Sequence, residues 1–218
     1  LTPGSRIVIL LFRWLLFRLR FMSGLSKLTM QDPGWSGLTA LNSYFEVQPL
    51  PTPLAWYAHQ LPDWLLKTAT AATLVIEILV PLMMFLPRRW RFTAAWLTIL
   101  WQILIILTSN HNWINFLTII LCLFLFDDRA IRSVMPGKLC DWLLRQKQLA
   151  TIPALFRWPS YVFASVILVT SSIQIGEMAT GIRISGNPGR VLDYIERWSL
   201  ANPYHVFPTV NQQRVELI

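Results

Sequence analysis

The chain has 218 residues, of which 54% are hydrophobic and only 14% are charged, and its mean hydropathy is +0.47. An ordinary soluble domain carries more charge and less apolar surface, so this composition predicts a polytopic membrane protein. The net charge of +8 does not indicate a nucleic-acid partner. Basic residues beside apolar segments are typical of membrane topology, and the sequence contains no basic-aromatic nucleic-acid motif.

The first apolar segment, residues 7 to 25, is unusually rich in cations. Four of them recur every seven residues: Arg6, Arg13, Arg20 and Lys27. Seven residues make nearly two helical turns, so the four lie along one stripe of a helix, whereas Arg18 points elsewhere. One interpretation is that the end residues extend to the membrane interfaces and neighbouring helices shield Arg13. The other is that the stripe pairs with an acidic residue of a second helix.

The connection from residue 28 to 60 contains five residues that break regular structure: Gly34, Gly37, Pro49, Pro51 and Pro53. Its three closely spaced prolines predict an extended polyproline II segment. Thr52 followed by Pro53 is a good N-cap and first-turn pair. We therefore expect a short helix over residues 54 to 60.

Three side chains of this short helix are of the kind that settles among lipid headgroups: Trp56, Tyr57 and His59. The helix then anchors the connection at the membrane interface. The alternative is that it presents a binding surface to a partner protein or lipid.

Residues 64 to 86 form an apolar helix that is long enough, at about 1.5 Å per residue, to cross a hydrocarbon core of about 30 Å. Glu77 lies near its middle. An ionised carboxylate at that depth costs about 2.5 to 3.5 kcal/mol on insertion scales, so Glu77 must be protonated, paired or facing a wet interior. Pro81 also lacks the N–H that would bond the Glu77 carbonyl. We expect a buried pair between Glu77 and an arginine of the first helix.

Three further apolar segments predict helices over residues 92 to 107, 113 to 126 and 158 to 175. Residues 87 to 91 are predicted to form a short basic turn and residues 109 to 112 a polar one. Together with the first two segments, this pattern predicts an all-α polytopic membrane protein with about five transmembrane helices in residues 1 to 176 and short interfacial helices.

Residues 177 to 218 predict a partly structured extramembrane tail. Asn187 and Pro188 are an N-cap and first-turn pair for an amphipathic helix with an apolar stripe of Val191, Ile195 and Trp198. Residues 206 to 218, VFPTVNQQRVELI, have the pattern of a strand. We therefore expect a β region that begins here and continues in sequence downstream.

The distribution of cations predicts an orientation. The 87 to 91 turn and the connection from 129 to 157 hold nine of the 19 Lys and Arg residues, whereas residues 28 to 60 and 109 to 112 hold none. The positive-inside rule then places the first connection, the 109 to 112 turn and the tail outside. The three histidines, His59, His111 and His205, share that side, but their spacing matches no zinc motif, so no metal site is predicted.

Two sets of residues are candidates for function. The first faces the outer side and is predicted to bind a partner: Glu46, Gln48, Trp56, Tyr57, His59, Asn110, His111 and Asn115. The second consists of polar side chains buried within the apolar segments: Arg13, Arg20, Glu77 and Gln102. The sequence contains no HExxH, GxSxG or CxxC motif and no glycine-rich phosphate loop, so we predict no catalytic residue and no cofactor.

Several stretches resemble the lipase maturation factor family. They are RWLLFRLRFMSGLSKL (13 to 28), DPGWSGLTAL (32 to 41), QPLPTPLAWYAHQLP (48 to 62), the acid-bearing helix that ends in PRR (87 to 89), NFLTIILCLFLFDD (115 to 128) and NPYHVF (202 to 207). The resemblance covers nearly the whole chain. Family members usually carry further spans upstream and a β-rich domain downstream, so the chain resembles an internal piece.

The resemblance implies a multi-pass membrane protein that helps secreted client proteins such as lipases to fold and mature. It implies membrane lipids and a client protein as partners. The location would be the endoplasmic reticulum membrane in a eukaryote, or the inner or plasma membrane in a bacterium. The residues alone leave two other functions open. Glu77 at a polar cavity would suit an intramembrane enzyme or lipid-modifying protein, and a midplane acid beside a proline-broken helix would suit a small-solute transporter.

Overall fold

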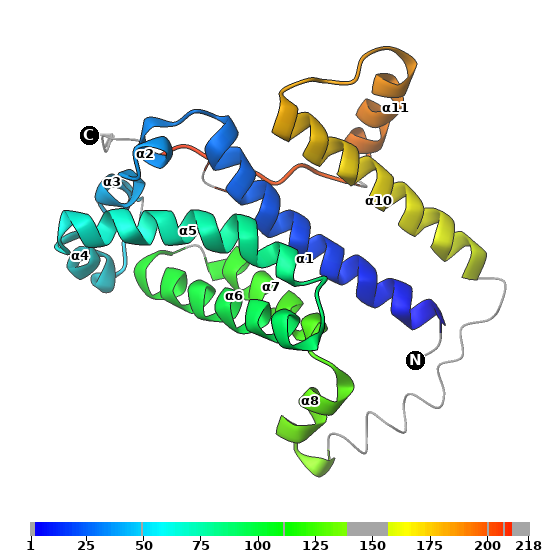
Figure 1. Cartoon of the computed structure of the whole chain (residues 1–218), viewed down its shortest axis with the longest axis horizontal. Helices are drawn as coiled ribbons and strands as arrows, with labels where there is room; N and C mark the ends of the chain where they lie inside the picture. The colour runs from blue at the N-terminus through cyan, green and yellow to red at the C-terminus, as the bar shows by residue number, and fades with distance from the viewer. Residues whose placement is uncertain are drawn as a thin grey trace.

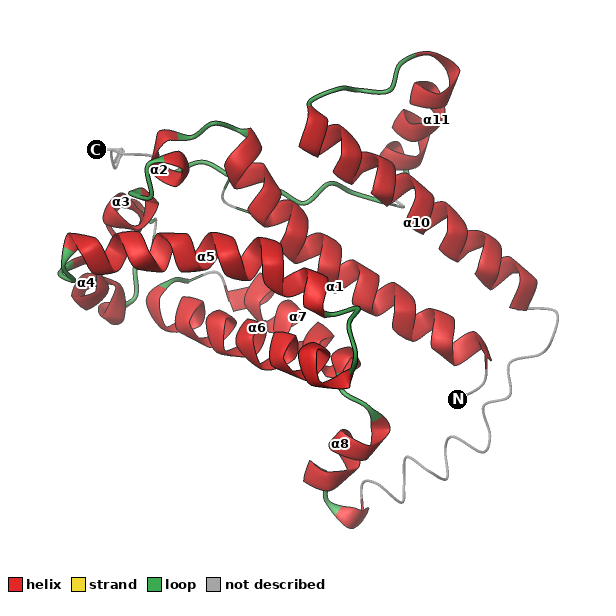
Figure 2. Cartoon of the chain, in the orientation of Figure 1, coloured by secondary structure: helices red, strands yellow, loops and turns green. Residues whose placement is uncertain are grey.

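The computed structural model describes residues 3–48, 50–110, 112–138, 157–199, 201–206 and 208–210. Within these ranges every regular element is a helix and none is a strand (Figure 2). The prediction of an all-α fold is therefore confirmed. The helices are, in chain order, α1 (Pro3–Thr29), α2 (Pro33–Ser36), α3 (Ala40–Val47), α4 (Pro53–His59), α5 (Asp63–Met83), α6 (Arg88–Thr108), α7 (Asn112–Cys122), the 3-10 turn η1 (Leu123–Leu125), α8 (Asp128–Val134), α10 (Arg157–Thr180) and α11 (Gly186–Arg197).

Three of these helices are long and apolar enough to cross a membrane, namely α5, α6 and the Trp158–Thr180 part of α10. A shorter apolar helix, Trp113–Leu125, combines α7 with η1. The protein is accordingly an all-α polytopic membrane protein. A helix of 27 residues, α1, covers the first predicted segment. Its crossing of the membrane, and the total of five spans, stay predictions.

The first turn of α6 corrects the predicted basic turn, since residues 88 to 91 are helical. Arg88 Nε donates to the Asp127 carboxylate at 2.5 Å, and Arg91 Nε donates to the carbonyl of Leu125 at 2.7 Å. Both partners follow α7 and lie far along the chain from the two arginines, so a local sequence pattern does not predict these contacts. They hold the arginines in a helical turn instead of a loop.

Asp127 joins two elements at that end of the hairpin. Its carboxylate accepts the hydrogen bond from Arg88 and, as the N-cap of α8, a second one from the N–H of Ala130 at 2.8 Å. Both bonds favour the ionised form and lower the pKa of Asp127 from its ordinary value. The connection into α8 is thereby fixed to the start of α6.

The connection from residue 28 to 60 contains three short helices, although only the last of them was predicted. Asp32 caps α2 by accepting hydrogen bonds from two backbone N–H groups. α3 buries Phe45 against Ala55 of α4 and Leu66 of α5. Tertiary packing therefore stabilises a helix over Ala40–Val47, part of which the sequence suggested to be a loop.

The third of these helices, α4, confirms the predicted cap. Thr52 Oγ1 accepts a hydrogen bond from the N–H of Ala55 at 3.3 Å, and Pro53 occupies the first turn. Gln48 and Thr52 have extended dihedrals, with φ and ψ of −64° and 141° and of −76° and 161°, close to those of polyproline II. Pro49 lies outside the described residues.

The long helices run alternately up and down the molecule, with α1 between α5 on one side and α10 on the other (Figure 1). Their shared core consists of small and aliphatic side chains: Leu16, Leu19, Val80, Met84, Ala94, Ala95, Leu121, Cys122 and Leu125. Gly24 brings α1 close to α5, since a Cβ at this position would lie 2.7 Å from Ile78 Cγ1 and 2.8 Å from Glu77 Cβ. The absence of a side chain at Gly24 thus allows these two helices to meet beside Glu77.

The segment after α11 does not form the expected strand in the part that is described, residues 201 to 206 and 208 to 210. It runs as an extended chain past α10 and α1 towards α2 (Figure 1). Tyr204 and Val206 pack against the helical core. Its backbone groups bond to helix side chains, which takes the place of pairing with another strand. Residue 207 and residues 211 to 218 of the predicted β region lie outside the described residues.

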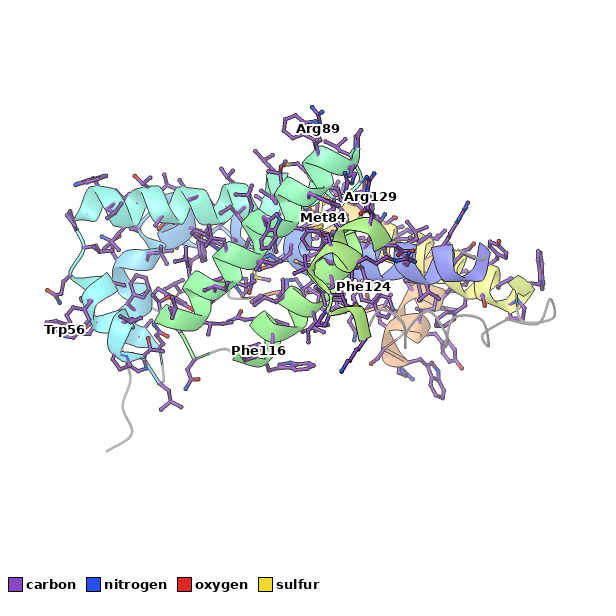
Figure 3. All side chains as sticks on the ribbon, turned by 90° about the horizontal axis from the view of Figure 1, so that it is seen from below. Trp56, Met84, Arg89, Phe116, Phe124 and Arg129 are labelled. Carbon is purple, nitrogen blue, oxygen red and sulfur yellow. The ribbon has the colours of Figure 1, made fainter. Side chains whose placement is uncertain are left out.

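The two ends of α5 and α6 differ in chemistry. Trp56 of α4 lies at one end of these helices, and Arg89 and Arg129 lie at the other (Figure 3). The basic residues thus gather at the end of these helices away from α4, which agrees with the orientation expected from the cations. The orientation itself is a prediction that labelling can test.

Single cysteines at Ser43 and Asn110 should react with a membrane-impermeant thiol reagent from one side of the membrane, and a cysteine at Ser133 should react only from the other. The background for all three is a Cys140→Ser variant, because the remaining native thiol, Cys122, is buried. Labelling of all three positions from the same side would contradict the topology.

Gly24→Val should lower the free energy of unfolding by about 1 to 3 kcal/mol, because the new side chain overpacks the contact between α1 and α5. Gly176→Ala in α10 is the matched control, since a Cβ there meets nothing within 4 Å. It should be neutral or slightly stabilising. Thermal unfolding in detergent compares the two variants, and an unchanged unfolding temperature for Gly24→Val would contradict the close approach.

Candidate functional site

A buried cluster of charges surrounds Glu77 in the middle of α5. Its Oε1 lies 3.2 Å from Arg20 Nη2, and its Oε2 lies 2.7 Å from Lys27 Nζ. The hydroxyl of Ser23 donates to Oε2 at 3.3 Å. The Glu77 side chain is only 5% exposed. Both carboxylate oxygens are thus engaged, which is the condition for keeping an ionised acid in a low-dielectric interior.

All three partners of Glu77 come from one face of α1. Arg20, Ser23 and Lys27 are spaced by three and four residues, so they stand above one another on the helix. Gly24 lies within the same interval and lets this face approach α5. One short stretch of α1 therefore supplies two cations, a hydroxyl and the gap that admits the acid.

The extended segment after α11 completes the cluster. Lys27 Nζ donates to the carbonyl of Val206 at 2.7 Å, and Ser23 Oγ lies 3.2 Å from the same oxygen, so its single proton is shared between this carbonyl and Glu77 Oε2. These contacts hold the extended segment against α1. The Val206 carbonyl is neutral, so the formal charges of Arg20, Lys27 and Glu77 sum to +1.

The other arginines of α1 serve different contacts. Arg18 is buried and donates from Nη2 to the carbonyl of Asn202 at 2.7 Å and to Gln174 Oε1 at 3.3 Å. Arg13 is not brought to Glu77, and its Nε donates to the carbonyl of Phe124 at 2.8 Å. Of the arginines considered as partners for Glu77, the structure places Arg20 beside it.

A cavity of about 290 Å³ opens beside this cluster. Arg20, Lys27 and Glu77 line it together with Gln102 of α6, Asn115 of α7 and several hydroxyl side chains: Tyr44, Thr73, Thr108, Ser109 and Thr118. The rest of its wall is largely apolar or aromatic, including Leu19, Trp35, Leu41, Phe45, Leu61, Trp101, Leu104, Ile105 and Ile114. Gln102 and Asn115, assigned from the sequence to different candidate sets, thus belong to one pocket with the charged cluster.

The residues predicted to form an outer binding surface divide into exposed and buried groups. Trp56 and Tyr57 are exposed, and Glu46 and His59 form a loose pair with 4.0 Å between Oε2 and Nε2. Gln48 is instead buried, and its Nε2 donates to the carbonyl of Thr108 at 3.0 Å.

The 109 to 112 turn supplies two other members of that predicted surface. Asn110 is exposed. His111 lies outside the described residues. Among the residues that are described, no group of three or more His, Cys, Asp or Glu side chains is placed to hold a metal ion.

Sequence reasoning missed three members of the cluster around Glu77, which are Ser23, Lys27 and the Val206 carbonyl. Lys27 belongs to the seven-residue stripe but was assigned to the membrane interface, because it lies near the helix end. The Val206 carbonyl had no signal in the sequence, since any residue carries this group. The heptad spacing of Arg20 and Lys27 was the one feature that connects both cations to a single face.

Glu77→Gln should lower the free energy of unfolding by about 3 to 5 kcal/mol, because it leaves Arg20 and Lys27 buried without a counter-charge. Asp63→Asn is the control, since it removes an exposed acid whose carboxylate lies 2.7 Å from Lys67 Nζ. It should leave stability unchanged within error. Thermal unfolding and the yield of monodisperse protein are the measurements. A Glu77→Gln protein as stable as the control would show that the charge of Glu77 is dispensable.

Comparison with known proteins agrees with the resemblance seen in the sequence. A family model described as "Lipase maturation factor transmembrane domain" matches residues 1–133. Lipase maturation factor 2 of Gallus gallus is 45% identical over 175 residues, which cover 74% of this chain and 24% of the relative. The corresponding protein of Homo sapiens is 42% identical over 180 residues, which cover 82% of this chain and 24% of the relative.

A more distant relative covers all of the chain. Lipase maturation factor 1 of Homo sapiens is 30% identical over 226 residues, covering 100% of this chain and 39% of the relative. The chain therefore spans about a quarter of the length of the lipase maturation factor 2 proteins that it matches. No solved structure matches the chain. The family model matches more than half of the residues of this chain, and the relatives are 42% and 45% identical to it. The chain therefore belongs to the lipase maturation factor family.

Proposed function

We propose that this chain is the membrane-embedded part of a factor that assists the maturation of secreted client proteins such as lipases. Family membership supports a role in lipase maturation. The factor acts where secreted proteins enter the membrane system, which is the endoplasmic reticulum membrane in a eukaryote. The client binds on the side of the membrane to which α4 is exposed.

The observation that carries this proposal is an exposed aromatic pair, Trp56 and Tyr57, on α4. The two side chains are 63% and 65% exposed, and their rings meet edge to face with centroids 5.1 Å apart. Large aromatic side chains on a rigid element are the commonest anchors of protein interfaces. Both side chains stay exposed among the residues that the structure describes, so the pair is open to a partner or to the lipid surface.

α4 holds the aromatic pair in a fixed place. Thr52 caps the helix, and its Oγ1 also donates to the carbonyl of Leu107 at the end of α6, at 2.7 Å. Ala55 on the opposite side of α4 is fully buried against Phe45. Binding through a surface that is already ordered loses less conformational entropy than binding through a flexible loop.

Both oxygens of Glu77 are occupied by Arg20, Lys27 and Ser23. This pairing does not favour an intramembrane enzyme or a transporter in which Glu77 exchanges protons. We therefore assign Glu77 a structural role.

Replacing Trp56 and Tyr57 together by Ala should reduce client lipase activity by about tenfold at an unchanged level of the factor, since interface anchors contribute about 2 kcal/mol or more. Trp90→Ala is the matched control, because Trp90 is similarly exposed (57%) but belongs to the basic end of α6. Secreted lipase activity and the amount of factor in the membrane are measured in the same cells.

The two roles open to the aromatic pair predict different results. Membrane anchoring predicts that the double variant lowers the amount of factor and the client activity in proportion. Client binding predicts lower activity per molecule of factor. If the double variant matches Trp90→Ala in both measurements, the aromatic pair has no part in maturation.

A further inference from the structure

The pocket beside Glu77 contains hydrogen-bond donors that no group of the described residues satisfies. Five buried side-chain nitrogens have no partner in the part of the chain that the structure describes, and their residues all line this pocket: Arg20 Nε, Trp35 Nε1, Trp101 Nε1, Gln102 Nε2 and Asn115 Nδ2. Gln102 and Asn115 are only 1% and 3% exposed. A buried donor without a partner costs about 1 to 3 kcal/mol, so this arrangement reduces the stability of the fold.

The unpaired groups are of one kind, because all five are N–H donors. They come from α1, α2, α6 and α7, so no single irregularity of the backbone accounts for them. A ligand that satisfies them has to present acceptors. Carboxylate and phosphate oxygens are acceptors with several lone pairs each, so one such group can accept hydrogen bonds from several of these donors.

The charge of the residues that line the pocket also favours a ligand with acceptor oxygens. Two cations, Arg20 and Lys27, share a single acid, Glu77, and the next group that Lys27 contacts is the neutral carbonyl of Val206. One positive charge is therefore left without a counter-charge among the side chains that the structure describes around the pocket. An anion would balance it and would also accept the free N–H groups.

Much of the remaining wall is apolar, so the ligand needs an apolar part as well. Leu41 and Phe45 of α3, Leu61 before α5, and Leu104 and Ile105 of α6 line this side. At about 290 Å³ the pocket is near the lower limit of the roughly 300 to 1,000 Å³ that small-molecule sites occupy. That space admits one acyl chain segment with a compact head but not a lipid with two full chains.

We propose that this pocket binds a single-chain anionic lipid, with a carboxylate or phosphate head at Arg20, Gln102 and Asn115 and its chain against the apolar wall. The membrane around α5 and α6 supplies such lipids directly. The site is separate from the aromatic pair, Trp56 and Tyr57, that carries the proposed client surface. Lipid binding is measured here without any client, so its failure would leave the proposed maturation role intact.

The test uses the complete protein in nanodiscs of zwitterionic phosphatidylcholine and titrates cis-parinaric acid, a fluorescent fatty acid. Trp35 and Trp101 line the pocket, so excitation of tryptophan should produce saturable energy transfer to the bound acid. The methyl ester of the same acid is the matched ligand, because it keeps the chain and removes the charge. The ester should bind about tenfold more weakly or worse.

Two substitutions distinguish an effect on lipid binding from an effect on the stability of the fold. Gln102→Leu and Asn115→Leu should each weaken binding of the acid by about tenfold while leaving the unfolding temperature unchanged or raised, because each removes an unpaired donor. Gln174→Leu is the matched control for a buried amide with partners, since Nε2 of Gln174 donates to Glu196 Oε1 at 2.8 Å and to the carbonyl of Ala201 at 2.9 Å. It should lower the unfolding temperature and leave the affinity unchanged.

Competition by lysophosphatidic acid identifies the chemistry of the lipid head group. Displacement of the probe at concentrations below those needed for a fatty acid assigns a phosphate head, and the reverse order assigns a carboxylate head. Equal affinity for the acid and its methyl ester would overturn the proposal, and so would unchanged affinity in both Gln102→Leu and Asn115→Leu. The comparison of acid with ester needs only the unmodified protein, so it decides the matter even if a variant fails to fold.

Discussion

A buried carboxylate in the middle of an apolar helix has to be paired, and the arrangement of this fold around Glu77 follows from that requirement. α1 supplies Arg20 and Lys27 from a single face, and Gly24 on the same helix removes the side chain that would keep α5 away. The contact between the two helices is therefore both electrostatic and steric. Neither part is sufficient alone, since a close approach without the cations would leave the acid unpaired.

The same polar residues of α1 hold the extended segment 201 to 206 against the bundle. Its carbonyl groups accept hydrogen bonds from Arg18, Ser23 and Lys27, while Gln174 of α10 binds the carbonyl of Ala201. Irregular backbone is tolerated at membrane depth where protein groups replace water as partners. The arginines of α1 make it a poor lipid-facing helix, and Arg18 helps to hold the C-terminal segment against the bundle.

Buried polar groups in this protein fall into two classes with opposite effects on the stability of the fold. Glu77 and the carbonyls of segment 201 to 206 are satisfied by protein partners and stabilise one arrangement of the helices. The donors of Gln102 and Asn115 have no such partner among the described residues, and an unpaired buried donor lowers the stability of the fold. The proposed ligand would satisfy these donors, and the paired cluster around Glu77 holds the helices that carry them.

The sequence by itself determined the membrane class, the positions of the long helices and the cap of α4, because composition, apolar periodicity and the Thr52-Pro53 pair act over a few neighbouring residues. It also indicated that Arg20 and Lys27 share one stripe. Only the tertiary structure decided that Lys27 and the Val206 carbonyl meet, that residues 206 and 208 to 210 form no strand, and that residues 88 to 91 are helical. The reason is that these outcomes depend on partners far away in the chain. Lys27 and Val206 are separated by 179 positions, and no local pattern carries information over that distance.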